Sequence, residues 1–223
     1  MSKRLYVDIF FPFVTDLEVK RAVVLMGPRR VGKTVMMYHA IQELMDQQVP
    51  ATNIIFVGID NPIYMHLGLE DLLEISLKAL GKKDAVGSFV FFDEIQYLKD
   101  WERHLKVLVD RYPETKFIVS GSAAAALKLQ STESGAGRFT EFMLPPLTFQ
   151  EYIHLKGLNH LMHASSIVYH GKEVSYHGTH DIRTLNEEFF HYLNFGGYPE
   201  VVLSERIQSD PGRYIKSDIV DKV

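Results

Sequence analysis

The stretch LMGPRRVGKT, residues 25–34, constrains the fold of this chain more than any other. It separates an apolar run, AVVLM at 22–26, from a segment with helical periodicity that begins KTVMMYHA. An ordinary turn needs one residue that tolerates positive φ, whereas this turn carries two glycines, a lysine and a threonine. Backbone amides and an ammonium at the start of a helix are suited to an anion, and phosphate is the first candidate.

The spacing of this stretch is G-x-x-x-x-G-K-T, which is that of a nucleotide-binding phosphate loop. A strand before the loop and a helix after it are the context that supports the match. In such a loop Lys33 contacts the β- and γ-phosphates and the Thr34 hydroxyl binds Mg²⁺, while the side chains of Arg29 and Arg30 point into solvent. The residues expected to bind the nucleotide are Gly27, Pro28, Arg29, Arg30, Val31, Gly32, Lys33 and Thr34.

Apolar runs that alternate with amphipathic segments predict the fold of the first 150 residues. Further strands are expected at 53–60, 88–95, 116–122 and 139–146, and helices at 33–48, 69–80 and 100–112. Strands that alternate with helices imply right-handed crossovers, so the predicted fold is an α/β parallel sheet with helices on both faces. The first helix carries Val35, Tyr38, Ile41, Leu44 and Met45 at helical spacing, and Met36, Met37 and Tyr38 are expected to pack in the core.

The character of the sequence changes after this region, which predicts two domains. We expect a P-loop domain over residues 1–150 and a small C-terminal subdomain over residues 151–223. Thr148 and Glu151 have the spacing of a capping box, 167–177 reads as a hairpin and 185–195 as a helix. Residues 123–130 also read as helical, and 213–223 as the beginning of another helix.

Two acidic residues end the predicted strand FVFFD and favour hydrolytic chemistry. Asp93 is positioned to join the shell of a Mg²⁺ ion held by the phosphate loop. Glu94, the next residue, can take a proton from a water that attacks the γ-phosphate. A base beside the nucleotide favours a hydrolase over a kinase, because a kinase excludes water from this position.

Two further positions are candidates on weaker grounds. Ser120 or Ser122, at the end of the strand FIVSGS, can hydrogen-bond the attacking water, and Ser122 is preferred because it lies just past the strand. Arg138, in the polar loop STESGAGR, is either a solvated arginine or a residue that approaches a phosphate on its own or a neighbouring chain.

Composition excludes several other classes of protein. The 24 basic and 28 acidic residues give a net charge of −4, which argues against a broad surface for nucleic acid. Cysteine is absent, which favours a reducing, cytoplasmic compartment. Asp8 and Pro12 interrupt the apolar start of the chain, and we expect neither a signal peptide nor a membrane span. Seven of the ten histidines lie between 154 and 191, and they are interpreted as surface residues rather than a zinc site.

An ordered set of motifs resembles a widespread prokaryotic family of AAA-type ATPases. The motifs are GPRRVGKT, FFDEIQ followed by a tryptophan-led helix, IVSGS, GR before FMLPPLTFQEY, and FGGYPEVV. The resemblance implies ATP as the ligand, a sheet of order 5-1-4-3-2, a sensor role near Ser120 and Ser122, and Arg138 as an arginine finger. It also implies that similar chains continue past the position of Val223 into a C-terminal domain of poorly defined function.

The sequence therefore predicts an enzyme that binds ATP with Mg²⁺ and hydrolyses it, driving a conformational change in an attached domain. The absence of an N/T-K-x-D guanine signature also favours ATP. The main alternative is a nucleotide-gated switch with negligible turnover, and a small-molecule kinase is a weaker one. The expected partners are ATP and ADP, other copies of the chain and a protein client, with neither a membrane nor, in the favoured interpretation, nucleic acid.

Overall fold

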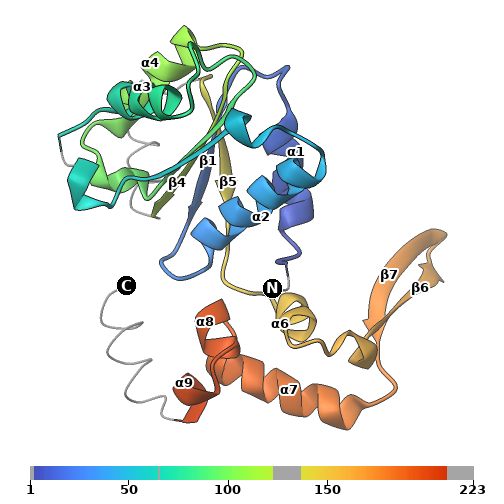
Figure 1. Ribbon diagram of the computed structural model, residues 1–223. Coiled ribbons are helices and arrows are strands. Elements are labelled where there is room, and N and C mark those ends of the chain that lie inside the picture. The colour runs from blue at the N-terminus through green and yellow to red at the C-terminus, as the bar shows by residue number, and fades with distance from the viewer. Residues whose placement is uncertain (1–2, 65, 123–136, 210–223) are drawn as a thin grey trace. The chain divides into compact units, whose positions relative to one another are not determined.

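The computed structural model describes residues 3–64, 66–122 and 137–209, and the chain divides into two compact units (Figure 1). The first unit comprises residues 5–144, and the second comprises residues 1–4 together with 145–223. The chain therefore passes between the units twice, at residues 4–5 and at residues 144–145. The division into domains expected from the sequence, at residue 150, stays a prediction. The expected helices at 123–130 and 213–223 lie outside the described residues.

The first unit is built on a five-stranded parallel sheet. Its strands are β1 (Ala22–Gly27), β2 (Ile54–Gly58), β3 (Phe89–Asp93), β4 (Lys116–Ser122) and β5 (Phe139–Met143). They pair in the order β2-β3-β4-β1-β5, and every pair is parallel. This confirms the α/β class and the strand order that the sequence motifs implied. All strands end at the same edge, which is where open parallel sheets bind their ligands.

Helices cover both faces of this sheet (Figure 1). Helices α1 (Val7–Thr15) and α2 (Lys33–Asp46) lie on one face, and α3 (Leu69–Ala79) and α4 (Trp101–Arg111) lie on the other. Short 3₁₀ turns, η1 (Ala51–Asn53), η2 (Pro62–Tyr64) and η3 (Ile95–Tyr97), join these elements. The strand β1 is buried on both sides, as its unbroken apolar run predicts.

Helix α1 is an element that the sequence did not predict. Its buried residues, Val7, Phe10 and Val14, have the spacing of one helix face, and the Phe10 ring lies 5.1 Å from that of Phe142. Asp8 and Pro12 interrupt the apolar run, but the helix continues through both, and both are exposed.

The buried face of α2 agrees in part with the expected one. Met36, Met37, Ala40 and Leu44 are fully buried, which confirms the expectation for Met36, Met37 and Leu44. Tyr38 and Met45 were also expected on the buried face, but they are 51% and 50% exposed. That part was wrong because apolar residues occur around most of the helix, and the sequence does not show which side meets the sheet.

The second unit contains a hairpin and several helices. The hairpin pairs β6 (His163–Tyr169) with β7 (Lys172–Gly178) in antiparallel register, which confirms the predicted hairpin. The two residues between the strands, His170 and Gly171, both have positive φ, as a tight two-residue turn requires. The helices are α6 (Phe149–Leu155), η5 (Asn159–Leu161), α7 (Ile182–Phe195), α8 (Pro199–Val202) and α9 (Glu205–Ser209).

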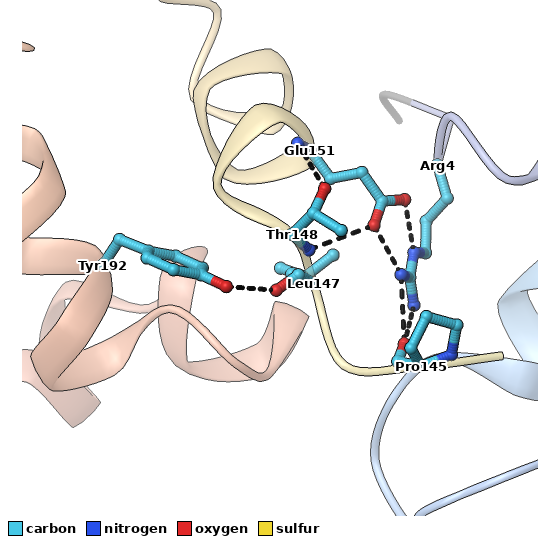
Figure 2. Close-up of polar contacts among 6 residues, drawn as sticks. All are labelled: Arg4, Pro145, Leu147, Thr148, Glu151 and Tyr192. Carbon is cyan, nitrogen blue, oxygen red and sulfur yellow. Dashed lines mark hydrogen bonds and ion pairs between the residues drawn. The ribbon is translucent and has the colours of Figure 1, made fainter.

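A buried ion pair fixes the N-terminal residues within this second unit, and Figure 2 shows its surroundings. The Glu151 carboxylate accepts hydrogen bonds from Arg4 Nε at 2.9 Å and Nη2 at 2.7 Å. The same carboxylate accepts one from the Thr148 amide, and the Thr148 hydroxyl accepts one from the Glu151 amide, so the predicted capping box is confirmed. Arg4 also donates to the Pro145 carbonyl at 3.2 Å, beside the point where the chain enters this unit.

The small core of this unit packs around α6. Tyr152 and Ile153 are buried with Leu147, Leu161 and Val202. The Tyr192 hydroxyl of α7 donates to the Leu147 carbonyl at 2.8 Å, which holds α7 against the start of α6 (Figure 2). Across the described parts of both units, no helix has the length and apolar character that a membrane span requires.

Candidate functional site

The site is built on the turn between β1 and α2, here called the glycine loop (residues 27–34). At Gly27 an added Cβ atom would lie 2.3 Å from the Leu144 carbonyl oxygen. This close approach arises because the Leu144 amide donates to the Met26 carbonyl at 2.7 Å, so the backbone after β5 passes against the loop. Gly32 has a φ of 92° and begins the helix. Both glycines are therefore required by the backbone itself.

The middle of the loop is anchored by one apolar side chain and exposes two basic ones. Val31 is fully buried, whereas Arg29 and Arg30 are exposed. Arg30 also has a φ of 63°, a left-handed conformation that non-glycine residues seldom adopt. A backbone wound in this way turns successive amides toward one point, which is the geometry of an anion-binding concavity.

Lys33 lies at the centre of the site and is only 5% exposed. Its ammonium donates to the carbonyls of Gly27, at 3.2 Å, and Pro28, at 2.9 Å. Burial lowers the pKa of Lys33, and the negative charges of Glu94 and Asp93 oppose that decrease. The ammonium thus faces two carboxylates across the site while its hydrogen bonds go to neutral carbonyls. A phosphate would give it charged acceptors, which form stronger hydrogen bonds.

Thr34 and Asp93 meet although 59 positions separate them in sequence. The Thr34 hydroxyl donates to Asp93 Oδ2 at 2.7 Å. Strand β4 lies between β3, which carries Asp93, and β1, which leads into the glycine loop. Its Ser120 hydroxyl donates to Asp93 Oδ1 and accepts from the Glu94 amide at 3.0 Å. A hydroxyl and a carboxylate beside a phosphate loop are hard oxygen ligands of the kind that Mg²⁺ takes together with phosphate oxygens and water. The side chains therefore fit that ion.

Glu94 turns sharply out of β3 and is held by a residue that the sequence analysis did not select. Its φ is 58°, and its Oε2 atom accepts a hydrogen bond from Gln96 Nε2. Gln96, in turn η3, accepts a hydrogen bond at its Oε1 atom from the Ser122 amide at 3.1 Å. In the sequence, Gln96 is marked only as an amide side chain two residues after Glu94. The left-handed backbone conformation of Glu94, which brings the two side chains together, cannot be recognised from the sequence.

The two serines of β4 contribute in different ways. Ser120 is fully buried and reaches Asp93 through its hydroxyl, whereas Ser122, the expected sensor, joins the network through its backbone amide. Side chains two positions apart project from the same face of a strand, so strand alternation does not account for this difference. A role for either serine in sensing phosphate stays a prediction.

Arg138 lies at the amino end of β5, whereas the glycine loop follows the carboxyl end of β1. It precedes β5, its carbonyl accepts from the Ala22 amide, and its Nε donates to Asp110 at 3.1 Å. Strand β5 has five residues and is parallel to β1, so about 17 Å of strand separates Arg138 from the loop edge. An arginine side chain does not span that distance, so the interpretation in which Arg138 acts on its own chain's phosphate is wrong. Action on a neighbouring chain stays a prediction.

The histidine-rich region does not assemble a metal centre among the described residues. No group of three or more His, Cys, Asp or Glu side chains comes together there in a way that could hold an ion. The His163 and His180 rings stack with their centroids 4.3 Å apart, which is a packing contact between the hairpin and the segment before α7.

Comparison with curated proteins identifies relatives that are themselves uncharacterized. The chain is 26% identical over 192 residues to Uncharacterized protein MJ1544 of Methanocaldococcus jannaschii, covering 84% of this chain and 38% of that protein. It is 22% identical over 184 residues to an uncharacterized protein of Haemophilus influenzae, covering 82% of this chain and 40% of that protein. The chain thus spans about two fifths of the length of these relatives.

Solved structures show a similar fold at low sequence identity. The S. cerevisiae Hsp104-ADP complex matches with a TM-score of 0.50 and 17% identity, over 69% of this chain and 23% of that one. The extended S. cerevisiae Hsp104:casein complex matches with a TM-score of 0.50 and 16% identity, over 71% and 30% of the two chains. The sequence model of the AAA domain family matches residues 19–153, a range that contains the glycine loop, Asp93 and Glu94. Since that match covers more than half of the 223 residues, the chain belongs to the AAA domain family of P-loop ATPases.

Proposed function

We propose that this chain binds ATP in the glycine loop and hydrolyses it in the presence of Mg²⁺. The observation that carries the proposal is the convergence of Lys33, Thr34 and Asp93 at one edge of the sheet, directly against the loop. The AAA family and its fold support nucleotide binding there. Adenine is favoured over guanine because the sequence lacks a guanine-recognition motif.

Each side chain has a distinct role in this proposal. Lys33 binds the β- and γ-phosphates, and Thr34 with Asp93 would hold Mg²⁺, which neutralises phosphate charge when it is bound. Glu94 orients a water molecule and accepts its proton as that water attacks the γ-phosphate. Ser120 keeps Asp93 and Glu94 together, because its hydroxyl contacts the carboxylate of one and the amide of the other.

Hydrolysis in this proposal changes the conformation of the attached second unit. The support is the contact at Leu144, the last residue of the first unit. Its amide bonds to Met26 and its carbonyl lies against Gly27, so a shift of the loop acts directly on the chain segment that leads into the second unit. We further propose a cytoplasmic protein that assembles with copies of itself and acts on a protein client.

Phosphate release and nucleotide affinity, measured together, test this proposal. We expect the chain to bind ATP, to release phosphate with Mg²⁺, and to stop releasing it when a chelator removes the ion. Glu94→Gln should retain ATP binding and slow release by about hundredfold or more, because an amide cannot accept the proton. Glu74→Gln, an exposed substitution on α3, is the matched control and should behave as the parent does.

Two results would contradict the proposal in different ways. Tight ATP binding by the parent without any phosphate release would favour the nucleotide-gated switch. Equal turnover by the parent and Glu94→Gln would show that another group is the base.

A further inference from the structure

Gln96 connects the residue proposed as the base to the end of the neighbouring strand. Its amide nitrogen donates to Glu94 Oε2, and its amide oxygen accepts from the Ser122 backbone amide at 3.1 Å. The anchor belongs to the sheet, because Ser122 ends β4 and lies opposite Gly27 of β1 in the parallel register. One side chain therefore links Glu94 to the centre of the sheet.

The position of Glu94 in the chain places this contact beside the glycine loop. Glu94 directly follows Asp93, whose carboxylate accepts a hydrogen bond from the Thr34 hydroxyl at 2.7 Å. The Glu94 amide donates to the buried Ser120 hydroxyl at 3.0 Å, which fixes its backbone at the end of β3. The bond to Gln96 fixes its side chain there.

We propose that Gln96 is a positioning residue for ATP hydrolysis, which fixes the Glu94 carboxylate in the orientation from which it accepts a proton. This inference rests on the proposed function. A free glutamate side chain samples several rotamers, and holding a reacting group in one geometry lowers the barrier to its reaction.

The chemistry of an amide suits this role better than that of other side chains. The position needs one donor for the Glu94 carboxylate and one acceptor for the Ser122 amide, and glutamine supplies both on a single planar group. A carboxylate here would keep the acceptor but place a second negative charge beside Glu94. A thioether would keep the length of the side chain and lose both strong hydrogen bonds.

The test therefore replaces the amide of Gln96 with a thioether or with a carboxylate. We expect Gln96→Met to lower kcat by about tenfold to hundredfold, the effect of losing a hydrogen bond to a charged group. Gln96→Glu should lower it further, because of charge repulsion. ATP affinity and the thermal melting temperature should stay near those of the parent in both variants. The matched controls are Gln42→Met and Gln42→Glu, since Gln42 also donates to a carboxylate, that of Asp46 at 2.8 Å, but on the exposed face of α2.

A double-mutant cycle shows whether Gln96 acts through Glu94. Single-turnover phosphate release is measured with the protein in excess, so that slow variants remain measurable. Adding Gln96→Met to Glu94→Gln should change the rate by less than about twofold if the two residues act as one unit. The inference is overturned if Gln96→Met lowers the rate by the same factor in the parent and in the Glu94→Gln variant. It is also overturned if Gln96→Met leaves kcat unchanged or raises it. If Glu94→Gln itself turns over like the parent, Glu94 is not the base and the role of Gln96 fails with that assignment. A parent that releases no phosphate contradicts the proposed function, whereas an effect missing only at Gln96 leaves the proposed function intact.

Discussion

At the scale of single residues, Lys33 is the side chain on which phosphate binding depends most directly. It is buried and its ammonium already lies within the glycine loop, so a phosphate would displace weak neutral acceptors. Lys33→Ala should weaken ATP binding by at least about hundredfold, because water replaces the ammonium poorly in a buried site. Isothermal titration with ATP measures the loss.

A second lysine provides the control for this prediction. Lys78 is exposed on α3, and Lys78→Ala should leave ATP affinity unchanged. Equal affinities of the Lys33→Ala variant and the parent would remove the basis for placing phosphate in the glycine loop.

At the scale of elements, the pairing of Arg4 with Glu151 of α6 is expected to stabilise the second unit. Glu151 is 1% exposed and Arg4 is 4% exposed, so losing either partner leaves a buried charge without its counter-charge. Glu151→Gln should lower the free energy of unfolding of α6 by about 3 kcal/mol. Hydrogen exchange of the α6 amides measures the change.

An exposed ion pair of the same unit serves as the comparison. Glu187 pairs with Arg183 one turn away on α7, where both are well exposed. Glu187→Gln should leave exchange unchanged, because surface pairs contribute little. If both substitutions had the same small effect, the Arg4 pair would not be a stabilising contact.

Glu188 of α7 contacts Tyr152 of α6 and Lys156, and its carboxylate is expected to make the stability of this unit depend on pH. Burial raises the pKa of Glu188, but hydrogen bonds from Lys156 at 2.7 Å and Tyr152 at 2.6 Å outweigh it, so the pKa lies below its ordinary value. A carboxyl group with a depressed pKa stabilises the folded state above its unfolded pKa, and this stabilisation disappears as pH falls through the folded pKa.

Thermal melting should therefore show a loss of stability between about pH 5 and pH 3 that Glu188→Gln reduces. Glu187→Gln should keep the parent's pH dependence, because its partner is exposed. Identical acid profiles for the parent and Glu188→Gln would show that the three-residue contact does not respond to pH.

At the scale of the whole molecule, the position of Arg138 makes catalysis by assembled chains testable. The arginine lies at the amino end of β5, remote from its own glycine loop, and is 44% exposed, so any phosphate that it contacts is expected to belong to another chain. If it stabilises charge there, phosphate release per chain should rise with protein concentration. Mixing an excess of Lys33→Ala chains into an Arg138→Ala sample should restore activity, because each variant supplies what the other lacks.

Light scattering on the mixed sample provides the control. Failure to restore activity in a sample that contains mixed oligomers would leave Arg138 as a solvated residue paired with Asp110. The Lys33→Ala chains alone should release no phosphate, which excludes them as the source of the restored activity.

The sequence by itself determined those features whose cause is local. The glycine loop, the buried strands and the capping box at Thr148 and Glu151 depend on φ preferences, apolar runs and hydrogen bonds between residues a few positions apart. Lys33 and Thr34 were placed in the site for the same reason. The apolar periodicity of α2 predicted a helix and the burial of Met36, Met37 and Leu44, but not the exposure of Tyr38 and Met45, because burial depends on the sheet that the helix meets.

The tertiary structure decided what depends on pairing between distant segments. Asp93 meets Thr34 because the parallel pairing of β3 with β4 and of β4 with β1 brings the carboxyl ends of these strands together, and the pairing of β3 with β4 also brings Ser120 to Asp93. The parallel register of β5 with β1 placed Arg138 at the remote edge, although its loop suggested proximity to phosphate. Gln96 gained its partners from the left-handed turn at Glu94. The sequence specifies the chemistry of each side chain. The direction in which a side chain points and its distance from the glycine loop depend on strand order and register, which no local sequence pattern determines.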